Sequence, residues 1–239
     1  DRSIESSFAF IKTNILPKKI ITPPQAFSKS CFDMFHDDEM KNCYNTFKKY
    51  FYKSIFLDKD HMKEFAIQKA VENDKNSNMF YIEFGVGRGT STNLFSKFLK
   101  ENKLYGFDSF VGLKEDWVGH PHYPAGSLSQ KGIIPKLKKN IVPIKGWIQD
   151  TLPQFIKEKN PKVNFIHIDV DTYETTKFIL ENLKPYINKG CIILFDEFYN
   201  FPGWSVGEYK ALIETFKEDE YEYLAFSYNK GNVTIKITK

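Results

Sequence analysis

Clustered acidic residues are the side chains in this sequence with the clearest potential for chemistry. Asp169 and Asp171 directly follow one short apolar run, and Asp196 and Glu197 directly follow another. If both runs are strands of one parallel sheet, their carboxyl ends bring these acids to the same edge. Carboxylates at close range repel one another unless a cation or protons intervene. Because hard oxygen ligands suit Mg²⁺ or another divalent cation, the pattern indicates a metal site.

A glycine-rich turn is the second candidate site. Gly85, Gly87 and Gly89 occupy alternate positions between an apolar run and a helical pattern, and Glu83 lies just before them. Such a turn lets the backbone approach a ligand and present N–H groups to it. The dinucleotide fingerprint is G-x-G-x-x-G, so the third glycine comes one residue early for a bound pyrophosphate. Asp108 ends the next apolar run, where an acid in nucleotide-binding sheets reaches ribose hydroxyls.

The elements that would position these residues alternate along the chain. From about residue 80 onward, short apolar runs alternate with helical patterns, which is typical of strand–helix units around a parallel sheet. The tail instead alternates like two strands around a turn, which indicates a hairpin. The sequence therefore predicts an α/β, Rossmann-like, doubly wound fold with a mostly parallel seven-stranded sheet and a C-terminal antiparallel hairpin. The expected strands cover residues 79–84, 104–107, 141–144, 163–168, 191–195, 221–228 and 233–237.

The N-terminal third lacks this alternation. It carries helical patterns at about residues 39–53 and 59–72. We expect residues 1–75 to form an N-terminal helical cap or lid and residues 76–239 to form the main domain. Within that domain, the segment Ser205–Glu208 fits a capping box, which predicts a helix start there.

The glycine turn and its neighbouring acids resemble the class I S-adenosylmethionine-dependent methyltransferases. In that family an acidic residue precedes G-x-G-x-G, as Glu83 does here, and a second acid ends the next strand, as Asp108 does. The resemblance implies that S-adenosylmethionine binds with its methionine part at the turn, its ribose at Asp108 and its adenine near Trp147. Carried over to this sequence, the expected cofactor-binding residues are Glu83, Phe84, Gly85, Gly87, Gly89, Thr90, Asp108, Ser109, Trp147 and Ile148.

Three longer segments resemble a narrower group, the macrocin O-methyltransferases, bacterial enzymes that methylate sugar hydroxyls using a divalent metal. The segments are residues 107–113, 167–176 and 195–199. This resemblance covers roughly residues 79–216 and implies that Asp169, Asp196 and Glu197 bind the metal. It leads us to expect methyl transfer to a hydroxyl of a sugar in a polysaccharide or glycosylated metabolite. Two alternatives stay open: methylation of a phenolic or catechol-like small molecule, and an inactive partner subunit that binds the cofactor.

The sequence leaves several candidates for the base that takes the hydroxyl proton. Asp169 or Asp171 could accept it, and so could His120 or His122 from a loop. Asp171 could equally cap a helix. We expect His167, which shares its strand face with Asp169, to be buried and hydrogen-bonded.

The composition is that of an ordinary globular protein. The 239 residues are 41% hydrophobic and 27% charged, and 34 basic against 30 acidic residues give a net charge of +4 spread along the chain. This excludes an acidic disordered chain and gives only weak support to a nucleic-acid partner. The resemblance implies a small-molecule or glycan acceptor and no nucleic acid, with a homo-oligomer left open. No apolar run approaches the roughly 18 residues of a membrane span. Three cysteines are too few for a disulfide framework, which favours the cytoplasm.

Overall fold

The structure is a computed structural model that describes residues 29–74, 78–120 and 123–239. The chain divides into two compact units, residues 1–34 and 35–239. The described part of the first unit contains the start of helix α2, where Ser30 and Asp33 form a reciprocal cap. The Asp33 N–H donates to Ser30 Oγ at 3.1 Å, and the Ser30 N–H donates to Asp33 Oδ2 at 2.9 Å.

Helices in the described segments are of two kinds. The α-helices are α2 (Cys31–Phe51), α3 (Lys59–Asn73), α4 (Thr90–Phe95), α5 (Ile148–Lys159), α6 (Tyr173–Leu183) and α7 (Glu208–Thr215). The short 3₁₀ turns are η1 (Lys184–Tyr186), η2 (Trp204–Val206) and η3 (Glu218–Glu220). None of these helices has the length and apolar character of a membrane span.

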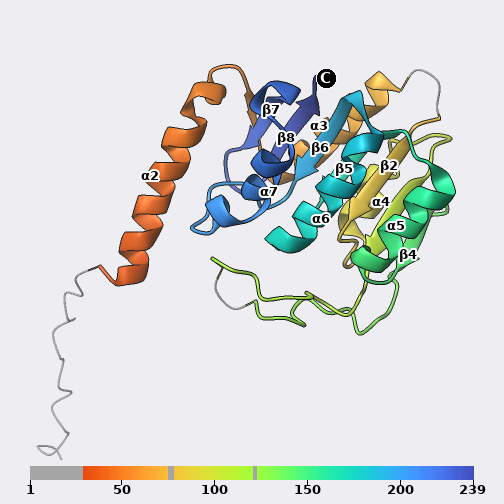
Figure 1. Cartoon of the computed structure of the whole chain (residues 1–239), viewed down its shortest axis with the longest axis horizontal. Helices are drawn as coiled ribbons and strands as arrows, with labels where there is room; N and C mark the ends of the chain where they lie inside the picture. Colours follow the sequence, from red (N-terminus) through yellow and green to blue (C-terminus); the bar gives the residue numbers. More distant parts are fainter. Residues whose placement is uncertain (1–28, 75–77, 121–122) are drawn as a thin grey trace, which may run out of the picture. The chain divides into compact units, whose positions relative to one another are not determined.

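The helices surround one eight-stranded sheet (Figure 1). Its strands are β1 (Ile55–Leu57), β2 (Phe80–Phe84), β3 (Leu104–Asp108), β4 (Ile141–Lys145), β5 (Val163–Ile168), β6 (Ile187–Phe195), β7 (Tyr221–Ser227) and β8 (Val233–Ile237). Their order is β1-β7-β8-β6-β5-β2-β3-β4, and β8 runs antiparallel to both β6 and β7. This confirms the Rossmann-like, mostly parallel sheet with a C-terminal antiparallel hairpin. The sheet has one strand more than expected, because the three-residue β1 is too short for its alternation to be recognised and joins the sheet by pairing with β7.

The chain changes direction across the sheet between β2 and β5. From β2 it continues to β3 and β4 on one side, whereas β5 pairs with the other side of β2 and leads to β6. Such a switch point opens a crevice at the carboxyl ends of the two strands, where open α/β sheets bind their ligands. The residues that follow these two strands are the glycine turn and Asp169.

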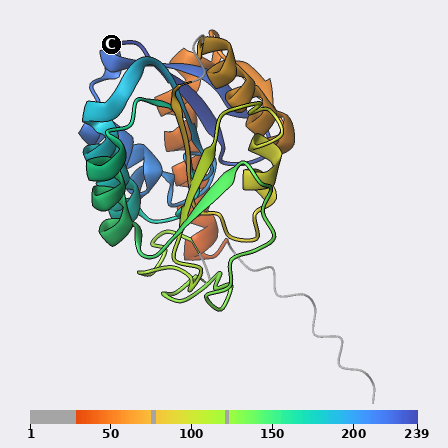
Figure 2. The ribbon, with the colours of Figure 1, turned by 90° about the vertical axis from the view of Figure 1, so that its right-hand side faces the viewer.

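Helical layers cover both faces of the sheet (Figure 2). Helices α3 and α4 contribute to one buried cluster, which includes Met62 and Phe95. Helices α5, α6 and α7 contribute to another, which includes Leu152. Phe165 of β5 joins the first cluster and Ile166 the second, because neighbouring side chains of a strand point to opposite faces.

The carboxyl-terminal half of α2 is part of the same core. Phe47 is fully buried, and its ring centroid lies 5.4 Å from that of Trp204, 5.2 Å from that of Tyr209 and 5.7 Å from that of Phe226. Helix α3 covers a sheet face through Met62. The expected division into a cap of residues 1–75 and a domain of residues 76–239 stays a prediction.

The start of α7 differs from the expected capping box. Ser205 lies in η2, α7 begins at Glu208, and the N-cap residue Gly207 makes no side-chain cap bond. Glu208 is fully buried, and its Oε2 accepts a hydrogen bond from the Glu197 N–H at 3.0 Å. Glu208, which was expected to cap the start of α7, therefore binds the backbone of the acidic pair Asp196 and Glu197 at the end of β6.

Candidate active site

A cavity of about 710 Å³ lies at the carboxyl ends of β2, β3, β4 and β5. Its volume is within the range of small-molecule sites. The expected cofactor-binding residues on its wall are Gly85, Gly87, Thr90, Asp108, Ser109, Trp147 and Ile148. Asp169 and Asp171 line the same cavity. The structure therefore brings the glycine turn and part of the acidic pattern into one space.

Gly85 explains why the two parts meet so closely. Its φ is +92°, and a Cβ built on it would lie 1.8 Å from the backbone carbonyl oxygen of Asp169. Only glycine permits both the left-handed conformation and this approach. Gly87 differs, since its φ is +51° and a Cβ there would meet nothing within 4 Å. The turn thus needs Gly85 for contact between strand ends, while Gly87 faces open space.

Asp108 is held by backbone donors. Its Oδ2 accepts from the Gly87 N–H at 2.7 Å, and its Oδ1 accepts from the Phe110 N–H at 2.6 Å. Each carboxylate oxygen keeps a lone pair for a further donor. Because Asp108 also lines the cavity, the carboxylate is fixed in place and still able to accept ligand hydroxyls.

Three of the expected cofactor residues lie off the cavity wall. Glu83 is fully buried, and its Oε1 accepts from Ser91 Oγ at 2.5 Å and lies 2.9 Å from His167 Nδ1. Phe84 is buried in the core and stacks on Phe107 at 4.9 Å. Gly89 caps α4, and a Cβ there would lie 2.8 Å from the side chain of Leu137. The side chains of Glu83 and Phe84 and the Cα of Gly89 face protein in this structure, and their role in binding the cofactor stays a prediction.

The far wall of the cavity carries an aromatic ring. Trp147 is the N-cap residue of α5, and Lys114 Nζ lies 5.7 Å from its ring centroid. Ile148 follows as the first residue of α5 and is buried. The pair presents an apolar surface at the end of β4, where the resemblance places adenine.

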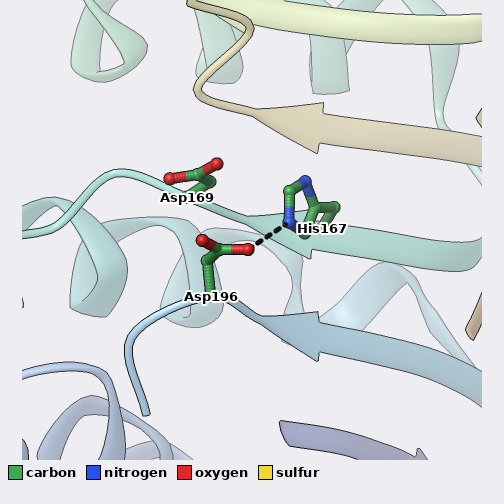
Figure 3. Close-up of side chains that lie close together, drawn as sticks. All are labelled: His167, Asp169 and Asp196. Atoms are coloured by element: carbon green, nitrogen blue, oxygen red, sulfur yellow. Dashed lines mark ion pairs between the residues drawn. The ribbon is translucent and has the colours of Figure 1, made fainter. Parts of the chain in front are cut away.

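The acidic side chains form two overlapping groups. One contains Asp169, Asp171 and Glu197, and the other contains His167, Asp169 and Asp196, with ligand-type atoms within 4.8 Å of one another in each group. Figure 3 shows Asp169 and Asp196 at the ends of neighbouring strands. Asp169 belongs to both groups, but the expected metal set of Asp169, Asp196 and Glu197 is not one of them.

The first group is poor in positive charge. Burial and the charge of Asp196 raise the pKa of Asp169 to about 7, and burial and the charge of Asp169 raise the pKa of Asp171 to about 8. Burial, followed by the charges of Asp196 and Asp169, raises the pKa of Glu197 well above its usual range. Glu197 Oε2 and Glu208 Oε1 are buried without a hydrogen-bond partner. The carboxylates on this side of the cluster therefore need protons or a cation to neutralise them.

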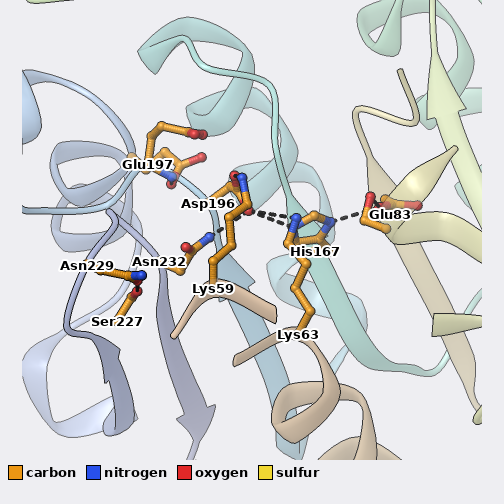
Figure 4. Close-up of polar contacts among 11 residues, drawn as sticks. Lys59, Lys63, Glu83, His167, Asp196, Glu197, Ser227, Asn229 and Asn232 are labelled. Atoms are coloured by element: carbon orange, nitrogen blue, oxygen red, sulfur yellow. Dashed lines mark hydrogen bonds and ion pairs between the residues drawn. The ribbon is translucent and has the colours of Figure 1, made fainter. Parts of the chain in front are cut away.

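Asp196 has the opposite surroundings. Its Oδ1 lies 3.1 Å from Lys63 Nζ and accepts from Asn232 Nδ2 at 2.6 Å, and its Oδ2 accepts from Lys59 Nζ at 3.2 Å (Figure 4). Burial alone would raise the pKa of Asp196, but the contact with His167 and the charge of Lys63 outweigh it and hold the pKa well below its usual range. Lys59 and Lys63 also line the cavity. The sequence analysis missed both lysines, and their spacing of one helical turn on α3 was the available signal.

His167 connects the two halves of the site. It is fully buried, its Nδ1 lies 2.9 Å from Glu83 Oε1, and its Nε2 lies 3.5 Å from Asp196 Oδ1 (Figures 3 and 4). The first distance is a hydrogen bond and the second is an ion-pair separation. Burial lowers the pKa of His167, but the two carboxylates outweigh this effect and raise it. The prediction of a buried, hydrogen-bonded histidine is confirmed.

The remaining candidate bases lie in different places. Asp171 adopts φ +64° between β5 and α6, a conformation that non-glycine residues hold at a cost of about 1–3 kcal/mol. The N-cap of α6 is Thr172, so Asp171 is not its capping residue. His120 stacks on Trp117 with ring centroids 4.1 Å apart and is not on the cavity wall. His122 lies outside the described residues.

Comparison with known proteins agrees with this architecture. Residues 82–198 match the model of a family described as a methyltransferase domain. The structure of the calicheamicin methyltransferase CalS11 has a TM-score of 0.61 at 20% identity, covering 84% of this chain and 85% of that one. The O-methyltransferase NovP has a TM-score of 0.54 at 18% identity, covering 75% of this chain and 79% of that one. The apo structure of CalS11, described as a TDP-rhamnose 3′-O-methyltransferase, has a TM-score of 0.53 at 22% identity, covering 73% and 76%. No curated protein matches the sequence.

The family match, the doubly wound sheet and the glycine turn at its switch point together define a class I methyltransferase domain. Residues 82–198 therefore form a methyltransferase domain. The class predicted from the sequence is confirmed.

Proposed function

We propose that this enzyme transfers a methyl group to a hydroxyl of a sugar, assisted by a divalent cation. The observation that carries the proposal is the direct contact between the glycine turn and the acidic cluster, made possible by Gly85. It brings the donor-binding turn and two acids of the cluster, Asp169 and Asp171, into one cavity. The likeness to CalS11, described as a TDP-rhamnose 3′-O-methyltransferase, supports a sugar acceptor.

The residues present fit the methyl donor. Asp108 would accept the ribose hydroxyls, the backbone around Gly87 would lie along the methionine part, and Trp147 would cover the adenine. S-adenosylmethionine supplies a methyl group made electrophilic by its sulfonium. The chain's contribution is orientation, because Asp108 is held by the N–H groups of Gly87 and Phe110 before any ligand arrives.

The acidic cluster also fits a divalent cation. Asp169 and Glu197 would hold it, with Asp171 or Asp196 as the third carboxylate. The unpartnered Glu197 Oε2 and Glu208 Oε1 are buried oxygens that such a charge would stabilise. A bound Mg²⁺ lowers the pKa of a coordinated hydroxyl.

Asp171 is the proposed proton acceptor, with Asp169 as the alternative on the same strand end. It lines the cavity, and burial and the charge of Asp169 raise its pKa, which makes its ionised carboxylate a stronger base. Its left-handed backbone fits a functional position, since such strain persists where the surrounding structure enforces it.

A small-molecule or glycan acceptor, and the cytoplasm as location, belong to the same proposal. Cys31, Cys43 and Cys191 are free thiols, which is the state expected in a reducing compartment. A phenolic acceptor is the competing reading of the same site.

Methyl transfer tests this proposal. The protein would be incubated with S-adenosylmethionine and Mg²⁺ and, in separate reactions, with a panel of nucleotide-sugars and a panel of catechols. Mass spectrometry would detect the added methyl group. We expect transfer to a sugar hydroxyl and its loss with a chelator. Methylation of catechols alone would contradict the sugar acceptor. Methyl transfer that a chelator does not reduce would contradict the role of the divalent cation.

A further inference from the structure

Two lysines of α3 converge on one acid of the site. Lys63 Nζ lies 3.1 Å from Asp196 Oδ1, and Lys59 Nζ lies 3.2 Å from Asp196 Oδ2 (Figure 4). The side chains of Lys63 and Asp196 are only 10% and 3% exposed, whereas that of Lys59 is 41% exposed. Both oxygens of this carboxylate therefore have a cationic partner at the cavity wall, and Lys63 is much the less exposed of the two.

Local structure fixes the position of these lysines. The N-cap residue Asp58 accepts hydrogen bonds from the N–H groups of Asp60 and His61, which sets the start of α3 at Lys59. Met62 is fully buried against the sheet, which sets the rotation of the helix. Lys59 and Lys63 are one helical turn apart, so both project from the same side.

The neighbouring acids lack such partners. In the described part of the chain, no ion pair within 4.0 Å joins a lysine or arginine to Asp169, Asp171 or Glu197. Positive charge in the cluster is therefore concentrated at Asp196. A divalent cation that approached an oxygen of Asp196 would meet an ammonium group about 3 Å from that oxygen, and like charges repel strongly where little water screens them.

We propose that Lys59 and Lys63 are built-in competitors of the divalent cation at Asp196 and set the affinity of the site for it. The inference rests on the cation in the proposed function. Without an added cation, the two ammonium groups neutralise Asp196. A cation held by Asp169 and Glu197 gains Asp196 as a further ligand only when a lysine withdraws, and the more exposed Lys59 is the one with room to do so.

A purely structural role makes a different prediction. If the lysines only neutralised a buried acid, their removal would lower stability and leave cation affinity unchanged. If they compete, removal frees an oxygen of Asp196 and also removes a repelling charge. Cation affinity must then increase, so the direction of the change separates the two roles.

Direct binding of Mn²⁺ tests the inference without turnover. Wild type, Lys63→Met and Lys59→Met would be titrated with Mn²⁺ in the absence of acceptor, with bound metal followed by calorimetry and electron paramagnetic resonance. Lys69→Met is the matched control, because Lys69 lies on the same helix, is 41% exposed and pairs with Glu72 at 2.7 Å. We expect Mn²⁺ to bind about tenfold more tightly to Lys63→Met, because a repelling charge is removed. Lys59→Met should show a smaller gain and Lys69→Met no change.

Each outcome bears on the inference. Unchanged or weaker Mn²⁺ binding by both site variants would overturn it, and so would failure of all the proteins to bind Mn²⁺. If Lys63→Met folds only when Mn²⁺ is present, the metal has replaced the ammonium, which supports it. If Lys63→Met does not fold at all, the Mn²⁺ affinity of Lys59→Met relative to the wild type tests the inference. Methyl transfer by the wild type is measured separately. If the wild type is active but the lysine variants bind Mn²⁺ with unchanged affinity, this inference is wrong and the proposed function still holds.

Discussion

The donor side and the acidic side of the site stabilise their carboxylates in different ways. On the donor side, Asp108 accepts N–H groups from Gly87 and Phe110, two residues of the adjoining turns. On the acidic side, Asp196 is held by side chains from α3 and from Asn232 just before β8, which are remote in the sequence. The donor side is thus a local structure, whereas the acidic side exists only when distant elements have packed.

This difference has a functional consequence. Backbone donors cannot leave, so the donor side is rigid before ligands bind. Lysine side chains are flexible and can be displaced, so the acidic side can change its charge balance. Gly85 joins the two sides through its contact with the Asp169 backbone, and His167 joins them through Glu83 and Asp196.

The largest expected effect comes from the acidic side. Asp171→Asn should lower kcat by about 10²- to 10⁴-fold, because the amide cannot accept the hydroxyl proton. Affinity for S-adenosylmethionine should stay near that of the wild type, since the donor side is held separately. Steady-state kinetics and calorimetry would measure the two quantities. Asp116→Asn is the control, as Asp116 is an exposed loop acid that accepts from the Ala125 N–H. Full activity of Asp171→Asn would remove Asp171 from the mechanism.

The link between the two sides is the next target. Gly85→Ala should lower the free energy of unfolding by at least about 3 kcal/mol, because the new Cβ would overlap the Asp169 carbonyl and the residue has φ +92°. Gly87→Ala meets no atom within 4 Å and should cost roughly 1–2 kcal/mol through its left-handed backbone alone. Chemical denaturation of both variants measures the difference. Equal losses would show that the close approach is not what requires Gly85.

The same contrast explains which parts were predictable from the sequence. The strand pattern predicts the parallel sheet and the hairpin, because alternation and turn residues are local signals. The resemblance assigned Gly85, Gly87, Asp108 and Trp147 to the cofactor, and these four residues line the cavity. Strand β1 is missed, because three residues that pair with β7 carry no alternation of their own.

The acidic side was predicted only in outline. Spacing places Asp169 and Asp171 at one strand end and Asp196 and Glu197 at another, as found. It does not reveal which neighbours neutralise them, since Lys63 and Asn232 approach from elements that the sequence does not connect to β6. Glu83 has another neighbour that spacing along the chain does not reveal. Its position before the turn suggested a ligand contact, but the pairing of β2 with β5 places His167 beside it.

A moderate effect is expected on the donor side. Asp108→Ala should weaken S-adenosylmethionine binding by about 10- to 100-fold, because hydrogen bonds to a charged acceptor are worth roughly 1.5–3 kcal/mol. Isothermal calorimetry measures the dissociation constant. Mn²⁺ affinity, which belongs to the other side of the cavity, should not change. A variant that loses both affinities together would show that the two sides are not independent.

The smallest effect is the dependence of stability on pH. Asp169 and Asp171 have an ordinary pKa of 3.8, raised in the folded protein to about 7 and about 8, in both cases by burial and by neighbouring negative charge. At pH values between the ordinary pKa and the raised pKa, the folded state binds more protons than the unfolded state. Asp169 and Asp171 therefore stabilise the fold at low pH. Their contribution is lost as pH rises through the folded pKa values.

Thermal unfolding with chelator, from pH 5 to about pH 8.5, would isolate this contribution as a difference between two proteins. Asp171→Asn removes one of the titrating groups, so its melting temperature should fall less steeply with pH than that of the wild type. Adding Mg²⁺ at the upper end of the range should raise the wild-type melting temperature, because the cation compensates the same carboxylates that protons compensate at low pH. Parallel curves for the two proteins would mean that Asp171 is already neutralised by another group, and the acidic side would then resemble the donor side in needing no added charge.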